Sequence, residues 1–407
     1  MNRRDFVSGV AAAGVAAAAR PLRALPANKP LRLGVIGAGS RGQEVMRHFL
    51  HVPGVSVTAI CDIYDPRFAQ VNRIVGNDVW GTKDLNTFLT HGDMDAVLIA
   101  SPLACHAEHV LATAETGLPI YCEKAMGFTP DQCQKILSEL EARKTLFQIG
   151  HQYRYASWVV EAVKRIHAGE IGEPLQVYAY WHRNGNWRRP VPSPDPDKKL
   201  EHLINWRLYR ETSGGLVTEL GSHHIDLANW VFGERQPHSV LGTTSIARYH
   251  DGRTVGDNVQ ATFEYSKGRR MFFSSITDNA KVGNEVWVYG TEGSVSLTIE
   301  DATFYYEKKK SNAPAPSGKT IVQRGIETGA SYATHGEMPY RGEGARVKVA
   351  EHEDPTLSAV ESFIGAVRGE HPPVADAHVG YGSAIACAVA HDAVFTESKT
   401  AIPPFKA

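Results

Sequence analysis

Short apolar runs alternate with helical stretches over the first third of the chain. The runs typical of buried strands cover residues 31–36, 55–60, 95–100, 119–122 and 145–150, and the main helical stretches cover 43–50, 106–116 and 130–143. Strands that alternate with helices build a parallel sheet covered by helices. The pattern therefore predicts a doubly wound α/β domain over residues 31–150.

The pattern changes after Gly150. A helical stretch at 157–167, a strand-like run at 175–181 and a Pro-rich loop at 189–198 come first, and longer alternating runs follow at 259–265, 270–277, 285–289 and 294–299. Such alternation is typical of antiparallel strands. A Pro/Ser/Ala loop is expected at 311–318, before helical runs at 355–368 and 380–395. We predict an α+β domain over 151–407 with an open, mainly antiparallel sheet and a C-terminal helix that packs back on the first domain.

The first 27 residues have the pattern of an export signal. Arg3-Arg4-Asp5-Phe6 precedes an Ala/Gly/Val run over 10–19, and small residues lie around Ala24 and Ala27. This order is typical of a removable twin-arginine signal. An amphipathic first helix is the alternative, but the run has no polar face. We expect a periplasmic or otherwise exported protein without a stable membrane span after signal removal, because this longest apolar run is short for a bilayer.

Composition excludes several classes of protein. The 407 residues carry 43 Lys+Arg and 44 Asp+Glu, and 43% are hydrophobic, which is ordinary globular composition. Because no basic excess exists to neutralise phosphates, nucleic acid is not an expected partner. The five cysteines are odd in number and form no CxxC pair, which argues against a disulfide framework or a structural zinc site. His151, His182, Glu219 and His223 lack ligand spacing, so no metal is predicted.

A glycine-rich sequence follows the first predicted strand and precedes the first helix. It reads Gly37-Ala38-Gly39-Ser40-Arg41-Gly42, the GxGxxG pattern of dinucleotide binding. The first glycine allows a tight turn, the second lets a pyrophosphate approach the backbone, and the third lets helix and strand pack closely. Asp62 ends the second strand, where a carboxylate binds the ribose 2′-hydroxyl. It favours NAD over NADP, although Arg41 and Arg67 leave NADP open; a ligand-free turn is the other interpretation.

From about residue 30 onward the chain resembles the glucose–fructose oxidoreductase, inositol dehydrogenase and MocA family. The resemblance rests on the glycine pattern with Asp62, Ala100-Ser101-Pro102 with His106, Cys122-Glu123-Lys124, Gly214-Gly215 with Glu219, His223-His224-Ile225-Asp226, and the late segments 363–368 and 374–376. It implies a Rossmann domain, an open-sheet domain, a cofactor between them, and sugars or cyclitols as substrates. Two positions depart from the family pattern: Ala125 replaces a proline, and Glu219 replaces an aspartate four residues before the histidine.

The resemblance and the motifs together identify candidate site residues. The predicted cofactor-binding residues are Gly37, Gly39, Ser40, Arg41, Gly42, Asp62, Ser101, His106, Glu123, Lys124 and Gln152. Aromatic residues interleaved with Arg, Asn and His, at 180–189 and 205–207, are typical of sugar binding. The predicted substrate-binding residues are Tyr153, Arg154, Trp181, Trp206 and His224.

The predicted catalytic residues are Lys124, Glu219 and His223. If 213–233 forms one helix, with Ser213 as its N-cap and Gly233 as its stop, Glu219 and His223 lie on one face at i and i+4. A carboxylate beside an imidazole orients it and raises its basicity, as a base that takes a hydroxyl proton requires. The resemblance makes Lys124 a catalytic or substrate-orienting residue. The alternatives without a catalytic role are that Lys124 is a solvated surface lysine and that the histidines only contribute to helix packing.

These observations lead to an expected function with two alternatives. We expect an NAD-dependent oxidoreductase that acts on a sugar or glycoside hydroxyl. Because an exported enzyme has no access to the cellular NAD pool, we expect its cofactor to be tightly bound and recycled within each turnover. The first alternative is a redox-neutral glycoside hydrolase that works by transient 3-keto oxidation, elimination and water addition. The second is a non-catalytic sugar-binding protein. By analogy with the family we also expect a homo-oligomer, a dimer or a tetramer.

Overall fold

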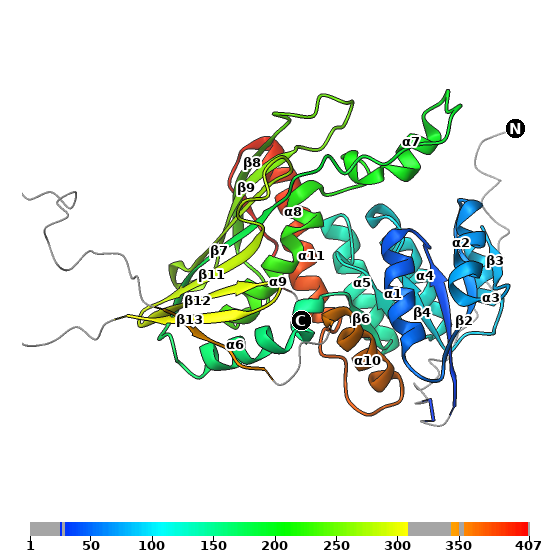
Figure 1. Ribbon diagram of the computed structural model, residues 1–407, viewed down its shortest axis with the longest axis horizontal. Helices are drawn as coiled ribbons and strands as arrows, with labels where there is room; N and C mark the ends of the chain where they lie inside the picture. The colour runs from blue at the N-terminus through cyan, green and yellow to red at the C-terminus, as the bar shows by residue number, and fades with distance from the viewer. Residues whose placement is uncertain (1–24, 27–28, 308–342, 350–353, 406–407) are drawn as a thin grey trace, which may run out of the picture.

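The computed structural model describes residues 25–26, 29–307, 343–349 and 354–405, and it places them in two adjoining domains (Figure 1). Most of the predicted export signal and the predicted loop at 311–318 lie outside these residues. Within the described chain, no helix is both long enough and apolar enough to cross a bilayer.

The N-terminal domain contains a six-stranded, wholly parallel sheet in the order β3-β2-β1-β4-β5-β6. Its strands are β1 Leu31–Ile36, β2 Val55–Cys61, β3 Trp80–Thr82, β4 Ala96–Ile99, β5 Ile120–Cys122 and β6 Phe147–Ile149. Its helices are α1 Ser40–His51, α2 Pro66–Val75, α3 Leu85–Thr90, α4 His106–Thr116 and α5 Pro130–Arg143. The sequence analysis did not predict β3, α2 or α3. Strand β3 and helix α3 are too short to show a period, whereas α2 does carry apolar residues at helical spacing, at Phe68, Val71 and Ile74.

A helix from the C-terminal part of the chain completes the first domain. Helix α10 (Pro355–Val367) places Phe363 edge-to-face against Phe49 of α1 and Tyr121 of β5, with ring centroids 5.9 and 5.6 Å apart. All three rings are fully buried. Edge-to-face pairs add about 0.5–1.5 kcal/mol beyond the area that they bury. Helix α10 therefore returns to the first domain and packs on the α1 side of the parallel sheet, while the last helix, α11 (Ala377–Thr396), contacts α5.

The C-terminal domain contains a nine-stranded sheet in the order β14-β13-β12-β11-β7-β10-β9-β8-β15. Its strands are β7 Pro174–His182, β8 Ser239–Ser245, β9 Asn258–Glu264, β10 Arg270–Ile276, β11 Asn284–Gly290, β12 Gly293–Thr298, β13 Ala302–Tyr306, β14 Ala345–Arg346 and β15 Thr400–Ala401. Its helices are α6 Ser157–His167, α7 Lys199–Ile204, α8 Gly215–Glu219, α9 Gly221–Phe232 and α11 Ala377–Thr396. All neighbours are antiparallel except β7 and β10, which confirms the predicted fold class.

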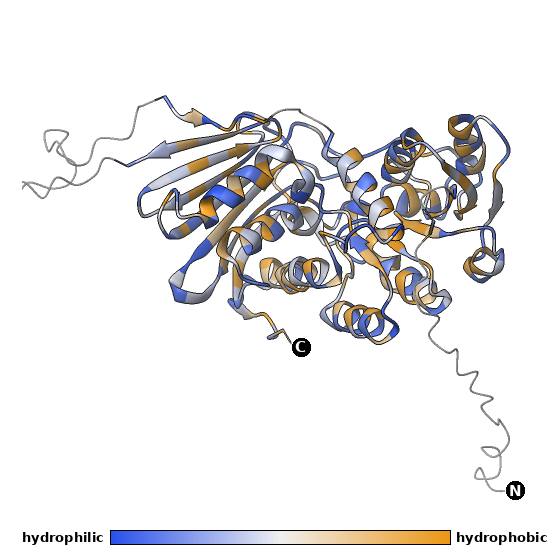
Figure 2. Cartoon of the chain, turned by 90° about the horizontal axis from the view of Figure 1, so that it is seen from below, coloured by the Kyte–Doolittle hydropathy of each residue, from blue (hydrophilic) through white to orange (hydrophobic). Residues whose placement is uncertain are grey.

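One face of this sheet is covered and the other is open. Helices α6, α8, α9 and α11 contact the covered face, and apolar and polar residues alternate along the strands (Figure 2). The open face carries large side chains such as Leu241 and Tyr289, which are 47% and 41% exposed. The Ser/Thr-rich strand β8 was not predicted, because its sequence, Ser-Val-Leu-Gly-Thr-Thr-Ser, lacks a regular apolar alternation.

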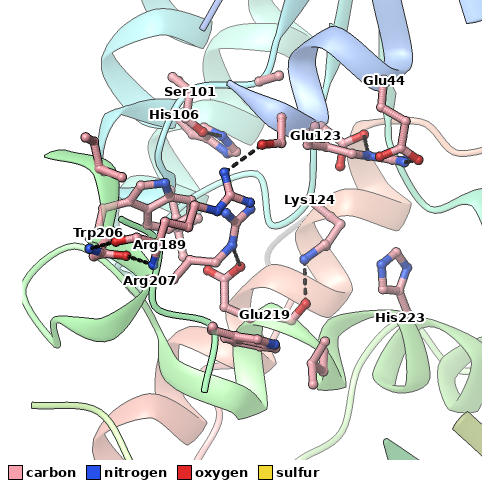
Figure 3. A pocket seen from close by; sticks show the side chains of 18 of the residues that line it. Glu44, Ser101, His106, Glu123, Lys124, Arg189, Trp206, Arg207, Glu219 and His223 are labelled. Atoms are coloured by element: carbon pink, nitrogen blue, oxygen red, sulfur yellow. Dashed lines mark hydrogen bonds and ion pairs between the residues drawn. The ribbon is translucent and has the colours of Figure 1, made fainter. Parts of the chain in front are cut away.

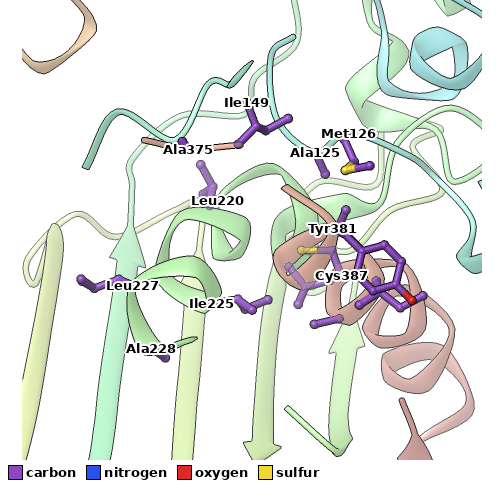
Figure 4. Packing of buried hydrophobic residues seen from close by; sticks show 14 of the residues in the cluster. Ala125, Met126, Ile149, Leu220, Ile225, Leu227, Ala228, Ala375, Tyr381 and Cys387 are labelled. Atoms are coloured by element: carbon purple, nitrogen blue, oxygen red, sulfur yellow. The ribbon is translucent and has the colours of Figure 1, made fainter. Parts of the chain in front are cut away.

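A continuous apolar core joins the two domains. Met126 and Ile149 of the first domain pack in one cluster with Leu220, Ile225 and Tyr381 of the second (Figure 4). Helix α11 is buried along most of its length and contacts both α5 and α9. Close packing of this kind leaves little freedom for one domain to slide on the other. The seam therefore holds the carboxyl edge of the parallel sheet against the start of α9.

The predicted single helix over 213–233 is wrong. The chain forms α8, breaks at Leu220 and restarts as α9, which ends at Gly233 in the left-handed conformation as expected. Leu220 has φ −116° and ψ −46°, outside the range of a regular helix. Side chains at 219 and 223 therefore do not follow the i, i+4 geometry of one continuous helix.

Candidate active site

A cavity of about 590 Å³ opens between the two domains (Figure 3). The N-terminus of α1 and the carboxyl ends of β4 and β5 contribute one wall. The end of β7, the loop that follows it and the α8–α9 break contribute the other. Eleven predicted site residues line this cavity: Ser40, Arg41, Ser101, His106, Glu123, Lys124, Gln152, Trp181, Trp206, Glu219 and His223.

The glycine loop beside the cavity is shaped for a dinucleotide. Gly37 has φ +86°, and a Cβ there would lie 2.5 Å from the Ser101 nitrogen. A Cβ on Gly42 would lie 2.1 Å from the Gly37 oxygen. At Gly39, by contrast, no atom of the described chain apart from its neighbours in sequence lies within 4 Å of the added carbon. Two glycines are thus required by packing, and the middle one borders open space.

The start of α1 is free to bind an anion. Gly39 is its N-cap, so no side chain caps the first turn, and that turn contains no acidic residue. The first amide groups of a helix lack internal partners and lie at the positive end of its dipole. A pyrophosphate would satisfy them, as in other dinucleotide sites. The residues present therefore fit the predicted cofactor.

Asp62 follows β2 and lies next to this loop. Its carboxylate accepts hydrogen bonds from the backbone nitrogens of Ala38, at 2.8 Å, and Tyr64, at 2.9 Å. The side chain is half-buried and stands beside the main cavity rather than in its lining. The carboxylate is thus oriented by the glycine loop, and its predicted contact with a ribose stays a prediction.

A polar network connects three predicted cofactor residues. The Arg41 guanidinium donates through Nε to Glu123 at 3.0 Å and through its terminal nitrogens to Glu44 at 2.8 Å and Gln152 at 3.4 Å. Glu123 is buried, so this ion pair supplies the charge compensation that a buried carboxylate needs.

His106 connects two strand ends. Its Nε2 lies 2.9 Å from the Ser101 carbonyl oxygen, and its Nδ1 lies 2.7 Å from the Ala125 carbonyl oxygen. The ring is buried, and the peptide bond between Lys124 and Ala125 is cis. His106 therefore positions the backbone that carries Lys124.

Lys124 crosses from the first domain to the second. Its Nζ donates to the backbone oxygen of Glu219 at 2.6 Å (Figure 3). Burial lowers the pKa of the Lys124 amine, and the positive charges of Arg207 and Arg41 act in the same direction, while Glu219 and Glu123 oppose them. A lysine with a lowered pKa is a stronger candidate for a base near neutral pH than an ordinary one.

His223 lies next to Lys124 in an apolar and aromatic setting. Its ring centroid is 5.2 Å from that of Tyr153, 5.6 Å from that of His151 and 5.8 Å from that of Trp181. Burial, followed by the charge of Lys124, lowers the pKa of His223 well below its usual value. Its Nδ1 is buried without a hydrogen-bond partner among the described residues. The imidazole is therefore neutral at ordinary pH.

The predicted pairing of Glu219 with His223 is wrong. The Glu219 carboxylate accepts from Arg207 Nε at 3.0 Å and from the Ser213 hydroxyl at 3.3 Å. The break at Leu220 turns the carboxylate away from the next helix, and Arg207 provides a charged partner that the 219–223 spacing could not reveal. Glu219 instead contacts Lys124 through its backbone oxygen.

Three predicted substrate residues do not reach the cavity lining. Arg154 forms a forked ion pair with Asp226, at 2.8 and 2.9 Å. His224 is fully buried, contacts Asn284 at 2.9 Å and has its pKa lowered by burial to about 4. Tyr153 accepts a hydrogen bond from the same asparagine. Buried polar groups need hydrogen-bond partners, and these three side chains find theirs in the protein. They therefore have a structural role in the cavity wall behind His223.

Sequence reasoning predicted Arg41 and pointed to the segments 180–189 and 205–207, but it named none of their arginines as site residues, although several line the cavity. Arg183 and Arg189 come from the loop after β7, and Arg207 follows the predicted Trp206, whose ring lies 4.4 Å below the Arg207 guanidinium. The only available signal was the density of arginines in 183–189. That signal does not say which of them face inward.

Sequence profiles of known families match most of both domains. Residues 31–151 match an oxidoreductase family with an NAD-binding Rossmann fold. Residues 159–296 match the GFO/IDH/MocA C-terminal domain. These two matches cover the strands and loops that build both walls of the cavity.

Individual proteins resemble the chain to different extents. Inositol 2-dehydrogenase 3 of Saccharopolyspora erythraea is 37% identical over 163 residues, which are 38% of this chain and 45% of that protein. The 2,7-anhydro-N-acetylneuraminate hydratase of Mediterraneibacter gnavus is 26% identical over 277 residues, 67% of this chain and 68% of that protein. Levoglucosan dehydrogenase, solved with NADH and levoglucosan, superposes with a TM-score of 0.70 at 20% identity, over 92% of this chain and 100% of that one.

Proposed function

Because the chain belongs to the GFO/IDH/MocA family of oxidoreductases, we propose that it oxidises a hydroxyl group of a carbohydrate with NAD as the hydride acceptor. The observation that carries the proposal is the position of Lys124. Its amine lies in the cavity between the domains, 2.6 Å from the Glu219 oxygen, with a lowered pKa. This is the carboxyl edge of a doubly wound sheet, where such folds bind their ligands.

Lys124 acts as the base in this proposal. Bound NAD supplies the hydride acceptor, and the protein supplies position and charge. The neutral amine takes the hydroxyl proton, and its remaining N–H groups keep the hydrogen bond to Glu219. A base of this kind is worth about a hundred- to ten-thousandfold in rate. The depressed pKa of His223 makes its imidazole a weaker base than the Lys124 amine. The neutral His223 borders the same space and therefore orients the substrate hydroxyl instead of taking its proton.

The aromatic and cationic lining supports a carbohydrate as the substrate. Trp181 and Trp206 border the cavity together with Arg183. Aromatic faces bury sugar C–H groups, and guanidinium forks bind hydroxyl oxygens. The named substrates of the relatives, an inositol and an anhydro-sugar acid, belong to the same chemical class.

A redox-neutral reaction is the second candidate. The relative named as a hydratase favours it, because addition of water changes no net oxidation state. In such a reaction, transient oxidation of a ring hydroxyl acidifies the neighbouring C–H, the aglycone leaves, water adds and the hydride returns. In this candidate reaction, Lys124 also accepts the proton from that neighbouring carbon.

One experiment separates these candidates from a non-catalytic sugar-binding protein. The purified protein is denatured, the released nucleotide is identified, and the native protein is then incubated with free sugars, cyclitols and aryl glycosides. Stoichiometric NADH indicates a dehydrogenase, and aglycone release without net NADH indicates the redox-neutral reaction. Loss of either activity in the Lys124→Met variant supports the site. Binding without turnover would refute both enzymatic candidates.

We further propose that the protein is exported with NAD retained and that it assembles through its open sheet. The twin-arginine pattern of residues 1–27 supports export, and the exposed Leu241 and Tyr289 support assembly. Fractionation of a tagged chain tests the first proposal. Light scattering of the native protein and a Tyr289→Lys variant tests the second, because a charge on a buried interface would release the protomers.

A further inference from the structure

The loop after β7 reaches from the second domain to the start of α1. The Arg189 guanidinium donates to the Ser40 hydroxyl at 2.6 Å, and Ser40 is the first residue of α1 (Figure 3). The contact joins residues 149 positions apart, and both residues line the cavity. The segment that carries α7 projects over this edge of the first domain (Figure 1).

The loop holds Arg189 in place on both sides. Asn205 is 2% exposed, and its amide oxygen and nitrogen pair with the backbone nitrogen and oxygen of Arg189 at 2.7 and 3.0 Å. The neighbouring Arg188 is bound to Glu201 and to Asp251. These contacts fix the backbone of Arg189, so that only its side chain has to be ordered when the guanidinium binds a ligand.

The Arg189 side chain is exposed, and its electrostatic setting favours a bound anion. The guanidinium lies at the N-terminus of α1, which is the positive end of the helix dipole and disfavours a cation. Within the described part of the chain, no carboxylate forms an ion pair with Arg189. Partial desolvation in the cavity mouth, and after it the charges of Arg207 and Arg67, lower the pKa of Arg189. The open space at Gly39 adjoins the same helix end.

We propose that Arg189 binds the pyrophosphate of the dinucleotide from the side opposite to α1, so that the second domain locks the cofactor in place. The inference rests on the proposed NAD function and adds a residue from outside the Rossmann domain. The pyrophosphate then lies between the amides of α1 and the guanidinium, and both find the negative charge that they lack. Release of the cofactor requires the loop after β7 to move away from Ser40.

The test measures how fast NADH leaves the full-length protein. Bound NADH is chased with excess NAD, and the loss of its fluorescence gives the release rate. We expect Arg189→Ala to accelerate release about ten- to a hundredfold, the value of one charge-assisted hydrogen bond. The release rate of Arg189→Lys should lie between those of the wild type and Arg189→Ala, since lysine keeps the positive charge but cannot form two parallel hydrogen bonds. High salt should narrow the difference between wild type and Arg189→Ala.

A matched variant and a stability measurement separate this role from a structural one. Lys199→Ala removes an exposed cation from α7 in the same segment and should leave release within twofold of wild type. The free Arg189→Ala protein should unfold at the wild-type temperature, because an exposed side chain contributes little to stability. Unchanged release in Arg189→Ala would overturn the inference, as would equal acceleration in Lys199→Ala. A wild-type protein that binds no NADH would overturn the proposed function as well.

Discussion

Replacement of Gly39 by alanine separates cofactor binding from folding. The residue has φ −68° and ψ −174°, which alanine adopts without strain, and apart from its neighbours in sequence no described atom lies within 4 Å of the added carbon. Alanine at a compatible glycine position stabilises a fold by about 0.4–1 kcal/mol through the unfolded chain. We therefore expect the free Gly39→Ala protein to unfold at the wild-type temperature or slightly above it.

The same carbon occupies space that a pyrophosphate needs. It forces the phosphate away from the amides of α1, and each charge-assisted hydrogen bond that is lost costs about 1.5–3 kcal/mol. At about 1.4 kcal/mol per tenfold change, one lost bond weakens NADH binding at least tenfold and two weaken it about a thousandfold. Titration of NADH fluorescence measures the dissociation constant, and thermal unfolding of the free protein measures stability.

Gly42→Ala is the matched control. Its Cβ would lie 2.1 Å from the Gly37 oxygen, so α1 must retreat, and both stability and NADH binding should fall. The reasoning would be refuted if Gly39→Ala bound NADH like the wild type. It would equally be refuted if the free Gly39→Ala protein lost as much stability as Gly42→Ala.

Three further predictions concern the charged groups of the site. Lys124→Met should lower kcat by about a hundred- to ten-thousandfold. In the wild type, kcat/KM should rise with pH through a pKa below that of ordinary lysine, because only the neutral amine accepts a proton. A pH profile without this rising limb would contradict the role of Lys124 as the base. Glu219→Gln removes a charge that raises the pKa of Lys124, so the limb should move to lower pH, whereas Glu44→Gln should leave it in place. Arg154→Leu leaves the buried Asp226 unpaired and should cost about 3–5 kcal/mol of unfolding free energy in denaturant titrations; a raised KM at full stability would instead indicate substrate binding.

Some errors of sequence reasoning share one physical cause. Period and spacing describe a residue's neighbours along one element, and Glu219 with His223 met the rule for a helix pair. The structure broke the helix at Leu220 and paired Glu219 with Arg207, 12 positions away in sequence. Arg154 likewise has the composition of a sugar ligand, but its buried partner Asp226 lies 72 positions away. Long-range charge pairs leave no periodic signal.

The sequence by itself determined the glycine loop, the parallel sheet and the position of Lys124 at its carboxyl edge. These follow from local requirements: Gly37 must have positive φ, Gly42 must pack without a side chain, and apolar runs must form buried strands. Only the tertiary structure decided which side chains share the cavity. The apolar seam places Lys124 against Glu219, and the loop after β7 brings Arg189 to Ser40. Both contacts cross between domains, because hydrogen-bond donors on one wall find oxygen acceptors on the other.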